Sequence, residues 1–273
     1  MKIYPTFPLA FSHTGQRTNN QDSLHPAVSK ATEQTQLFVV CDGIGGADKG
    51  EVASQLLCDT VADYALAMSN PMLDAVHIQV ILNRAYEAYR TYLAQHPLLS
   101  RMGSTLALLQ LHQQGVTVVH IGDSRVYQLR GGKVIFQTKD HRQVTDMVEA
   151  GIITATQALT HPWRNRLSRA VMASVTDKED EPVKLMADVV MLTDVQAGDY
   201  FFLCTDGVPE AVDIYMLETI LASNMPDQAK SESLQALCST HSKDNYSGYL
   251  IGISYVAHTE PKPVIQTITN YAD

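Results

Sequence analysis

Long apolar runs and charged residues are both scarce in this sequence of 273 residues. No stretch of about eighteen apolar residues occurs, so we expect no membrane-spanning helix and no membrane partner. Residues 1–15 are interrupted by Pro5 and Pro8 and lack the apolar segment of a secretory signal. Charged side chains make up 18% and apolar side chains 45%, which argues against a disordered chain and allows a sizeable core.

Basic runs and paired cysteines are also missing. The 20 Lys and Arg residues against 29 Asp and Glu residues give a net charge of −9, so nucleic-acid phosphates would repel the chain and no nucleic-acid partner is expected. The four cysteines lie in apolar segments and form no C-x-x-C pair: Cys41, Cys58, Cys204 and Cys238. Reduced, buried thiols in a cytoplasmic protein are the simplest interpretation.

Several catalytic signatures are absent. No cysteine is followed six residues later by arginine, which excludes the thiol phosphatase loop, and no G-x-S-x-G occurs, which excludes a nucleophile elbow. The glycines after Asp42 form no nucleotide loop, because Asp48 stands where G-x-G-x-x-G requires glycine and no Walker Lys-Ser/Thr follows. The ten histidines show neither H-x-x-x-H nor H-x-x-H spacing, so we do not expect zinc.

Hydrophobic periodicity predicts helices and antiparallel strands in separate groups. Apolar residues at three- and four-residue spacing, or in short runs, predict helices over 53–68, 73–93, 143–150, 214–223 and 227–240, and strands over 37–41, 105–112, 116–121, 126–130, 134–137, 200–205 and 249–255. Gly131-Gly132 predicts a type I′ hairpin. The rest of 141–180 is more polar and is interpreted as a surface excursion. This grouping predicts an α+β fold with helices packed on sheet faces.

Three apolar segments end in an aspartate beside a glycine. These are Asp42, Asp123 and Asp206, and Asp244 precedes the last predicted strand. Carboxylates fixed at one sheet edge repel one another unless a cation neutralises them, but an Asp-Gly after a strand is usually only a turn, and periodicity alone leaves both interpretations open. If a metal binds, the all-oxygen donor set favours Mg²⁺ or Mn²⁺. Two such ions, bridged by one aspartate, activate water for phosphoester hydrolysis.

Several short motifs occur in a fixed order along the chain: Arg17–Asp22 (RTNNQD), Asp42–Gly46 (DGIGG), Gly103–Leu106 (GSTL), Gly122–Tyr127 (GDSRVY), Asp140-His141, Asn165–Ala170 (NRLSRA), Thr205–Gly207 (TDG) and Asp244-Asn245. Together they make the chain similar to the metal-dependent Ser/Thr protein phosphatases, the PPM or type 2C family, and in particular to its compact bacterial members. The resemblance implies a phosphatase domain over residues 8–257 and a C-terminal tail over 258–273. It also implies a four-layer α/β/β/α sandwich, in which two antiparallel sheets are flanked by helices.

The resemblance further implies a dinuclear Mn²⁺ or Mg²⁺ site at one edge of the sandwich. Asp42 would bridge both ions, and the Gly43 carbonyl would help to hold the first. Asp206 and Asp244 would hold the second ion. Asp123, with Asp206, would support a third and weaker site, although Asp123 is alternatively the cap of the Asp-Ser-Arg turn.

Three residues near the N-terminus take roles from the same resemblance. Arg17 would bind the substrate phosphate, since a guanidinium matches two phosphate oxygens, although it is alternatively an ordinary surface arginine. Asp22 would order metal-bound water. Gln21 replaces the family's glutamate, so a direct metal contact there would be weaker, while a water-mediated role survives.

The sequence also differs from the family pattern at the general acid that protonates the leaving group and in the flap. Ile44 stands where eukaryotic members place a histidine that protonates the leaving group, so metal-bound water, which we favour, or His141 must serve. The flap residues Ser168 and Arg169 occur in SRAVM where the family usually has TRALG, and Met172 replaces its glycine. This change is expected to alter flap motion and substrate choice.

The predicted reaction is in-line attack on phosphorus by the water or hydroxide that bridges the two ions, with no phosphoenzyme. The expected substrates are phosphoserine and phosphothreonine in proteins, and a partner Ser/Thr kinase is expected by analogy. We further expect a cytoplasmic monomer. Two alternatives stay open: a pseudophosphatase that binds phosphoproteins without turnover, which Gln21 and Ile44 alone favour, and a phosphatase for small molecules.

Overall fold

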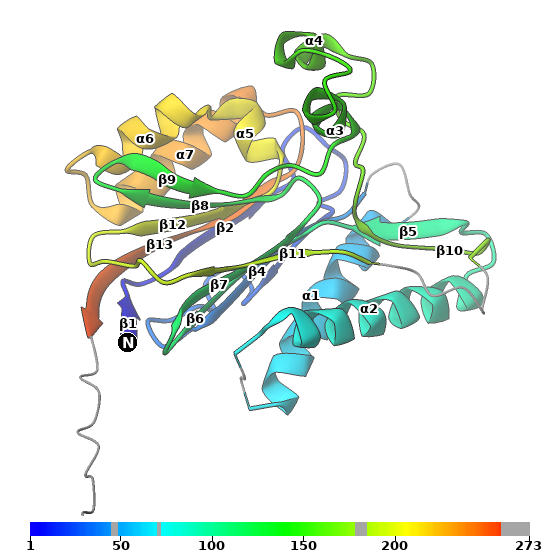
Figure 1. The fold of residues 1–273 in the computed structure, drawn as a ribbon, viewed down its shortest axis with the longest axis horizontal. Helices are drawn as coiled ribbons and strands as arrows, with labels where there is room; N and C mark the ends of the chain where they lie inside the picture. Colours follow the sequence, from blue (N-terminus) through cyan, green and yellow to red (C-terminus); the bar gives the residue numbers. More distant parts are fainter. Residues whose placement is uncertain (45–48, 70–71, 178–184, 258–273) are drawn as a thin grey trace, which may run out of the picture.

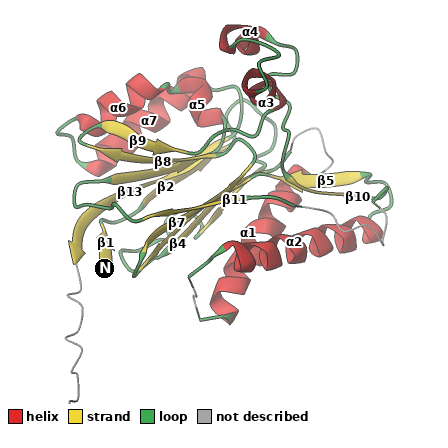
Figure 2. Ribbon diagram, viewed as in Figure 1, coloured by secondary structure: helices red, strands yellow, loops and turns green. Residues whose placement is uncertain are grey.

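A computed structural model describes residues 1–44, 49–69, 72–177 and 185–257. Two antiparallel sheets stack face to face, and helices cover their outer faces (Figure 1, Figure 2). The predicted tail over 258–273 lies outside the described residues. Among the described helices, none is long and apolar enough to cross a membrane.

The larger sheet has six strands in the order β1-β13-β12-β8-β9, and β2 also pairs with β13. Its strands are β1 (Lys2–Pro5), β2 (Leu9–His13), β8 (Arg125–Arg130), β9 (Lys133–Gln137), β12 (Tyr200–Cys204) and β13 (Tyr246–Ala257). The strand predicted over 249–255 is longer because β13 pairs with β1, β2 and β12. Gly131 and Gly132 both have positive φ and close the β8–β9 hairpin, as predicted.

The second sheet has five strands in the order β11-β7-β6-β4-β3. Its strands are β3 (Asp22–His25), β4 (Leu37–Asp42), β6 (Leu106–His112), β7 (Gly115–Ile121) and β11 (Asp188–Leu192). A separate two-stranded ribbon pairs β5 (Arg101–Ser104) with β10 (Val171–Ser174). The periodicity did not predict β1, β2, β3, β5, β10 or β11, because these four- and five-residue strands are short and partly polar.

Two pairs of long helices and three short ones complete the described fold. The helices are α1 (Gly50–Ala67), α2 (Ala75–Gln95), α3 (Gln143–Glu149), α4 (Ala155–Thr160), α5 (Gly207–Ala211), α6 (Ile214–Ala222) and α7 (Asp227–His241). α2 begins at Asp74, whose carboxylate accepts hydrogen bonds from the backbone N–H groups of Val76 and His77. α3 matches the helix predicted over 143–150, and α4 lies in the predicted surface excursion; both project beyond the sheets at the top of Figure 1.

Three apolar cores separate the four layers, because side chains alternate across each strand. Along β4, Val39 and Cys41 pack toward α1 and α2, whereas Phe38 and Val40 face the other sheet. A third core joins the larger sheet to α5, α6 and α7 and includes Phe202 of β12. This arrangement confirms the predicted α/β/β/α sandwich. All four cysteines are buried and free, as expected.

Candidate metal centre

The aspartates singled out in the sequence meet at one end of the sandwich. Asp42 ends β4 and lies opposite Asp22, which begins β3. Asp123 follows β7, Asp206 follows β12, and Asp244 precedes β13. In an antiparallel sheet the end of one strand lies beside the start of its neighbour, so the topology brings segments from across the whole chain to this edge.

Three of these carboxylates form a tight cluster. Asp42, Asp123 and Asp206 each offer an oxygen atom, and the three oxygens lie within 4.8 Å of one another. Burial, and then the charge of Asp206, raise the pKa of Asp42 well above its usual value. Burial, and then the charge of Asp123, raise the pKa of Asp206 to about 7. The cluster therefore places carboxylates that repel one another where their charged forms are disfavoured unless a cation binds.

Arg142 forms ion pairs with two members of this cluster. Its Nε donates a hydrogen bond of 2.8 Å to Asp123 Oδ2, and its Nη2 lies 3.7 Å from Asp206 Oδ2. Burial nevertheless raises the pKa of Asp123, although the charge of Arg142 opposes that shift. One guanidinium at the edge of the cluster does not balance three carboxylates.

Asp22 supplies an unpartnered oxygen beside the cluster. Its Oδ2 accepts a hydrogen bond of 2.9 Å from Thr205 Oγ1, whereas its buried Oδ1 has no partner among the described residues. Burial raises the pKa of Asp22 to about 7, and hydrogen bonds from Ser247 and Thr205 oppose that shift. A buried carboxylate oxygen without a donor is costly unless water or an ion reaches it.

Asp244 lies near the cluster but outside the group of three. Its Oδ2 accepts a hydrogen bond of 2.6 Å from Arg17 Nη2, and Asp206 and Asp42 are close enough to affect the pKa of Arg17. The Arg17 side chain is 56% exposed. The guanidinium thus lies at the mouth of the site with most of its donors facing solvent.

Backbone contacts hold Asp42 and Gly43 in place. The backbone N–H of Asp42 donates to Thr105 Oγ1, and its carbonyl accepts from the backbone N–H of Thr105 and from Ser104 Oγ, at 2.9–3.0 Å. A Cβ atom at Gly43 would lie 2.0 Å from the Gly50 carbonyl oxygen, so this approach requires glycine. Ser104 and Thr105 of the GSTL motif therefore fix the backbone of Asp42.

Gln21 lies on the same side of the site. Its backbone N–H donates to Asn245 Oδ1, and its carbonyl accepts from the backbone N–H of Gly43 at 3.0 Å. Its side chain packs against Gly50, where an added Cβ would lie 2.7 Å from Gln21 Nε2. Gln21 is therefore anchored by its backbone next to Asp22 and Gly43.

The flap residues form one hydrogen-bonded network with the turn that carries Asp123. The backbone N–H of Gly122 donates to His141 Nδ1 at 3.1 Å, and His141 Nε2 lies 3.1 Å from Asp188 Oδ2. Arg169 Nη1 donates to Asp188 Oδ1 at 2.9 Å, and the backbone N–H of Ser168 donates to the His141 carbonyl. His141 is thus a buried link between the flap and this turn, and both ring nitrogens are occupied.

His120, His141 and Asp188 also offer three ligand atoms within 4.8 Å. However, the hydrogen bond from Gly122 fixes the lone pair on His141 Nδ1, so Nε2 carries the proton and donates to Asp188. A protonated nitrogen has no lone pair for a metal. This second group therefore forms a positioning network and does not fit an ion.

Comparisons with known proteins agree with this geometry. Residues 11–237 match the family model described as protein phosphatase 2C. The chain belongs to the protein phosphatase 2C family.

Two curated relatives of this family are bacterial. Serine/threonine protein phosphatase PstP of Mycobacterium tuberculosis is 34% identical over 217 residues, which cover 79% of this chain and 38% of PstP. Protein phosphatase PhpP of Streptococcus pneumoniae is 28% identical over 229 residues, covering 80% of this chain and 85% of PhpP. The chain thus matches well under half of the length of PstP but most of PhpP.

A solved relative contains metal. The crystal structure of the catalytic domain of PstP in complex with two manganese ions has a TM-score of 0.69 and 29% identity, and the match covers 90% of this chain and 97% of that chain. In this phosphatase 2C chain, the all-oxygen cluster, the raised pKa values and the unpartnered Asp22 oxygen all fit Mn²⁺ or Mg²⁺.

Sequence reasoning assigned no role to Arg142, Asp188 or Asn245. Asn245 donates from Nδ2 to the Thr14 and Asn19 carbonyls at 2.7 and 2.9 Å and thereby holds the loop that carries Arg17. Asn245 belongs to the Asp244-Asn245 motif, so the sequence could have pointed to this residue. Its hydrogen bonds to the loop of Arg17 could not be predicted from the sequence. Arg142 directly follows the Asp140-His141 motif but is not part of it, and Asp188 lies in no motif, so the sequence gave neither of them a role.

Proposed function

We propose that this chain is a metal-dependent protein phosphatase that hydrolyses phosphoserine and phosphothreonine. The observation that carries the proposal is the uncompensated carboxylate cluster of Asp42, Asp123 and Asp206, beside the unpartnered oxygen of Asp22. PstP and PhpP, which carry the name of protein phosphatases, support the same reaction class.

The ion ligands are proposed as follows. Asp42 would bridge the two ions, a role supported by the rise in its pKa, which comes from burial and then from the charges of Asp206 and three further aspartates. The Gly43 carbonyl would complete the first site, Asp206 and Asp244 would hold the second ion, and Asp123 with Asp206 would support a third. When bound, the ions lower the pKa of a water molecule and offset charge on the phosphoryl oxygens.

Arg17 is proposed as the phosphate-binding residue. Its exposed guanidinium makes one short contact with Asp244 and keeps further donors for two phosphate oxygens. Asp22 orients water through its free Oδ1, with Gln21 held beside it. In this proposal Arg17 would position the phosphoryl group, and Asp22 with Gln21 would position the attacking water.

Protonation of the leaving oxygen is assigned to water. Ile44 has no ionisable group, and both nitrogens of the His141 ring are engaged by Gly122 and Asp188. His141 with Ser168 and Arg169 instead holds the flap over the Asp123 turn. The proton must therefore come from solvent in the site.

The biological setting is proposed in the same terms. The substrates are phosphorylated proteins, their phosphate is added by a Ser/Thr kinase, and the protein works as a cytoplasmic monomer without nucleic acid or membrane. The phosphatase domain over residues 8–257, followed by a tail over 258–273, also remains a proposal.

The test is hydrolysis of an aryl phosphate and of a phosphothreonine peptide by the purified chain with Mn²⁺, Mg²⁺ or EDTA. We expect phosphate release with Mn²⁺ that EDTA abolishes and re-added Mn²⁺ restores. Absence of release from both substrates, despite Mn²⁺ binding by calorimetry, would reject the enzyme and favour a phosphoprotein-binding relative.

A further inference from the structure

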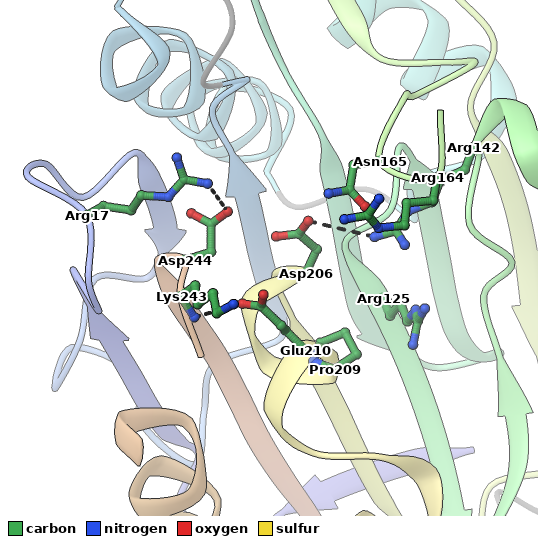
Figure 3. Close-up of a pocket in the computed structure, with 10 residues that line it drawn as sticks. All are labelled: Arg17, Arg125, Arg142, Arg164, Asn165, Asp206, Pro209, Glu210, Lys243 and Asp244. Atoms are coloured by element: carbon green, nitrogen blue, oxygen red, sulfur yellow. Dashed lines mark hydrogen bonds and ion pairs between the residues drawn. The ribbon is translucent and has the colours of Figure 1, made fainter. Parts of the chain in front are cut away.

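A second pocket opens beside the carboxylate cluster, with a volume of about 470 Å³. It is lined by ten residues: Arg17, Arg125, Arg142, Arg164, Asn165, Asp206, Pro209, Glu210, Lys243 and Asp244 (Figure 3). Arg17, Asn165, Asp206 and Asp244 also line the pocket that contains Asp42 and Asp123. The two pockets therefore share a wall, and a substrate held in one extends naturally into the other.

The charge of the second pocket is opposite to that of the chain. Its lining has five cationic side chains against three acidic ones, in a protein whose net charge is −9. Two of the acidic residues, Asp206 and Asp244, are the ion ligands proposed above. With their charge committed to ions, Glu210 is the one acidic residue of this lining that is not assigned to an ion.

Some of these cations already have protein partners. Arg125 forms two hydrogen bonds of 2.7 Å with Asp140. Arg142 is held by Asp123. These two guanidinium groups are fixed parts of the pocket wall.

Arg164 and Lys243 differ from them. Both are exposed, and neither side chain forms an ion pair with an acidic residue in the described part of the chain. Figure 3 shows Arg164 and Asn165 across the pocket from Lys243 and Glu210, with Asp206 between them. The Glu210 carboxylate accepts from the backbone N–H of Lys243 at 2.8 Å, so this contact does not involve the Lys243 ammonium.

We propose that Arg164 and Lys243 form a subsite for a second anionic group on the substrate, either a carboxylate or a further phosphate a few residues from the one removed. This inference rests on the proposed phosphatase function and specifies its substrate class as acidic or multiply phosphorylated segments. Two exposed cations beside the reaction site attract such a group, whereas a neutral segment gains nothing from them.

The test compares three phosphothreonine peptides with glutamate, phosphoserine or glutamine around the phosphothreonine. Arg164→Glu should lower the ratio of kcat/KM for the glutamate peptide to that for the glutamine peptide by about tenfold, and Lys243→Gln by about threefold, as expected for exposed ion pairs. The change should lie in KM, and the ratio should fall with added salt. Comparison of the phosphoserine peptide with the glutamate peptide shows whether the subsite prefers a phosphate or a carboxylate.

Lys30→Glu is the matched control, because Lys30 is exposed on the loop that follows the far end of β3 and the charge change is identical. It should leave every ratio unchanged. Equal ratios in Arg164→Glu and the unmutated chain would overturn the subsite.

A second readout is independent of turnover. Binding of the same peptides, with a fluorescent label and a non-hydrolysable phosphonate in place of the phosphate, is measured by anisotropy. The glutamate peptide should bind about tenfold more weakly to Arg164→Glu than to the unmutated chain, and the glutamine peptide should bind equally to both. If the chain releases no phosphate, the proposed function fails while this measurement still decides on the subsite.

Discussion

The two ends of strand β12 carry carboxylates in opposite states. Asp199, just before the strand, accepts hydrogen bonds from Arg130 Nε and Nη2 and from Gln128 Nε2 at 2.8–2.9 Å, and another from the backbone N–H of Gln196. Asp206, just after it, has Arg142 at 3.7 Å and two other carboxylates close by. The protein's own side chains neutralise Asp199, whereas Asp206 has to be neutralised by a bound cation.

This contrast separates a structural carboxylate from a functional one without reference to any relative. A fully paired buried charge contributes to the fold, and loss of one partner costs stability. A clustered charge without partners costs stability as it stands and persists where binding requires it. Four predictions test the distinction.

The largest effect is expected at the carboxylate cluster. Asp42→Asn should lower Mn²⁺-dependent kcat/KM by about a thousandfold, since loss of an ion ligand removes several kcal/mol of transition-state stabilisation. The ion-free variant should be at least as stable as the unmutated chain, because one repulsive charge is gone. Near-normal phosphate release by Asp42→Asn would make the site assignment wrong.

At Asp199, the fully paired carboxylate before β12, we expect a loss of stability without a loss of activity. Asp199→Asn should destabilise the fold by about 2 kcal/mol, because it weakens the ion pair of Arg130, which keeps Asp194. Urea unfolding measures the loss, and phosphate release per folded molecule should stay the same. If Asp199→Asn is as stable as the unmutated chain but releases phosphate more slowly, the distinction between a structural Asp199 and a functional Asp206 is wrong.

The pH dependence of the ion-free protein follows from the cluster. The pKa values of Asp22 and Asp206 are raised to about 7 in the fold, from an ordinary value of 3.8. The folded state therefore binds more protons than the unfolded state between about pH 4 and 7, so stability in EDTA should fall by a few kcal/mol as the pH rises through 7. Thermal unfolding at pH 5 and 8 measures this, and Mn²⁺ should restore the stability at pH 8. A flat profile in EDTA would contradict the cluster's repulsion.

The smallest effect is expected at the mouth of the site. Arg17→Ala should raise KM for an aryl phosphate by about tenfold, with a smaller change in kcat, because the guanidinium holds phosphate in the ground state. Steady-state kinetics separates the two constants. A loss confined to kcat would place Arg17 in the transition state instead.

The positions of the aspartates were predictable because buried strands have a strong apolar signal and each one ends at a carboxylate. β4 and β12 are almost wholly buried, so Asp42, the last residue of β4, and Thr205-Asp206, directly after β12, stand out as the polar residues at which these strands end. The partners of these residues were not predictable. Asp22 meets Thr205 across 183 positions of the chain, and only the sheet topology brings them together.

Short and exposed elements escaped prediction for a different reason. β5 and β10 have four residues each, too few for a period to emerge, and they are strands because they pair with each other. α4 buries no residue and depends on its Thr154–Gln157 capping box. Such elements depend on local partners and not on an apolar face.

The hydrogen bonds of Asn245 also determine when the site can form during synthesis on the ribosome. This residue ties down the loop that carries Arg17, and β13, which follows it, pairs with β1 and β2 from the other end of the chain. During synthesis from the N-terminus, the site therefore stays incomplete until β13, which ends at Ala257, has left the ribosome. A nascent or truncated chain that lacks this last strand would carry Arg17, Asp22 and Asp42 without being able to assemble them into a working site.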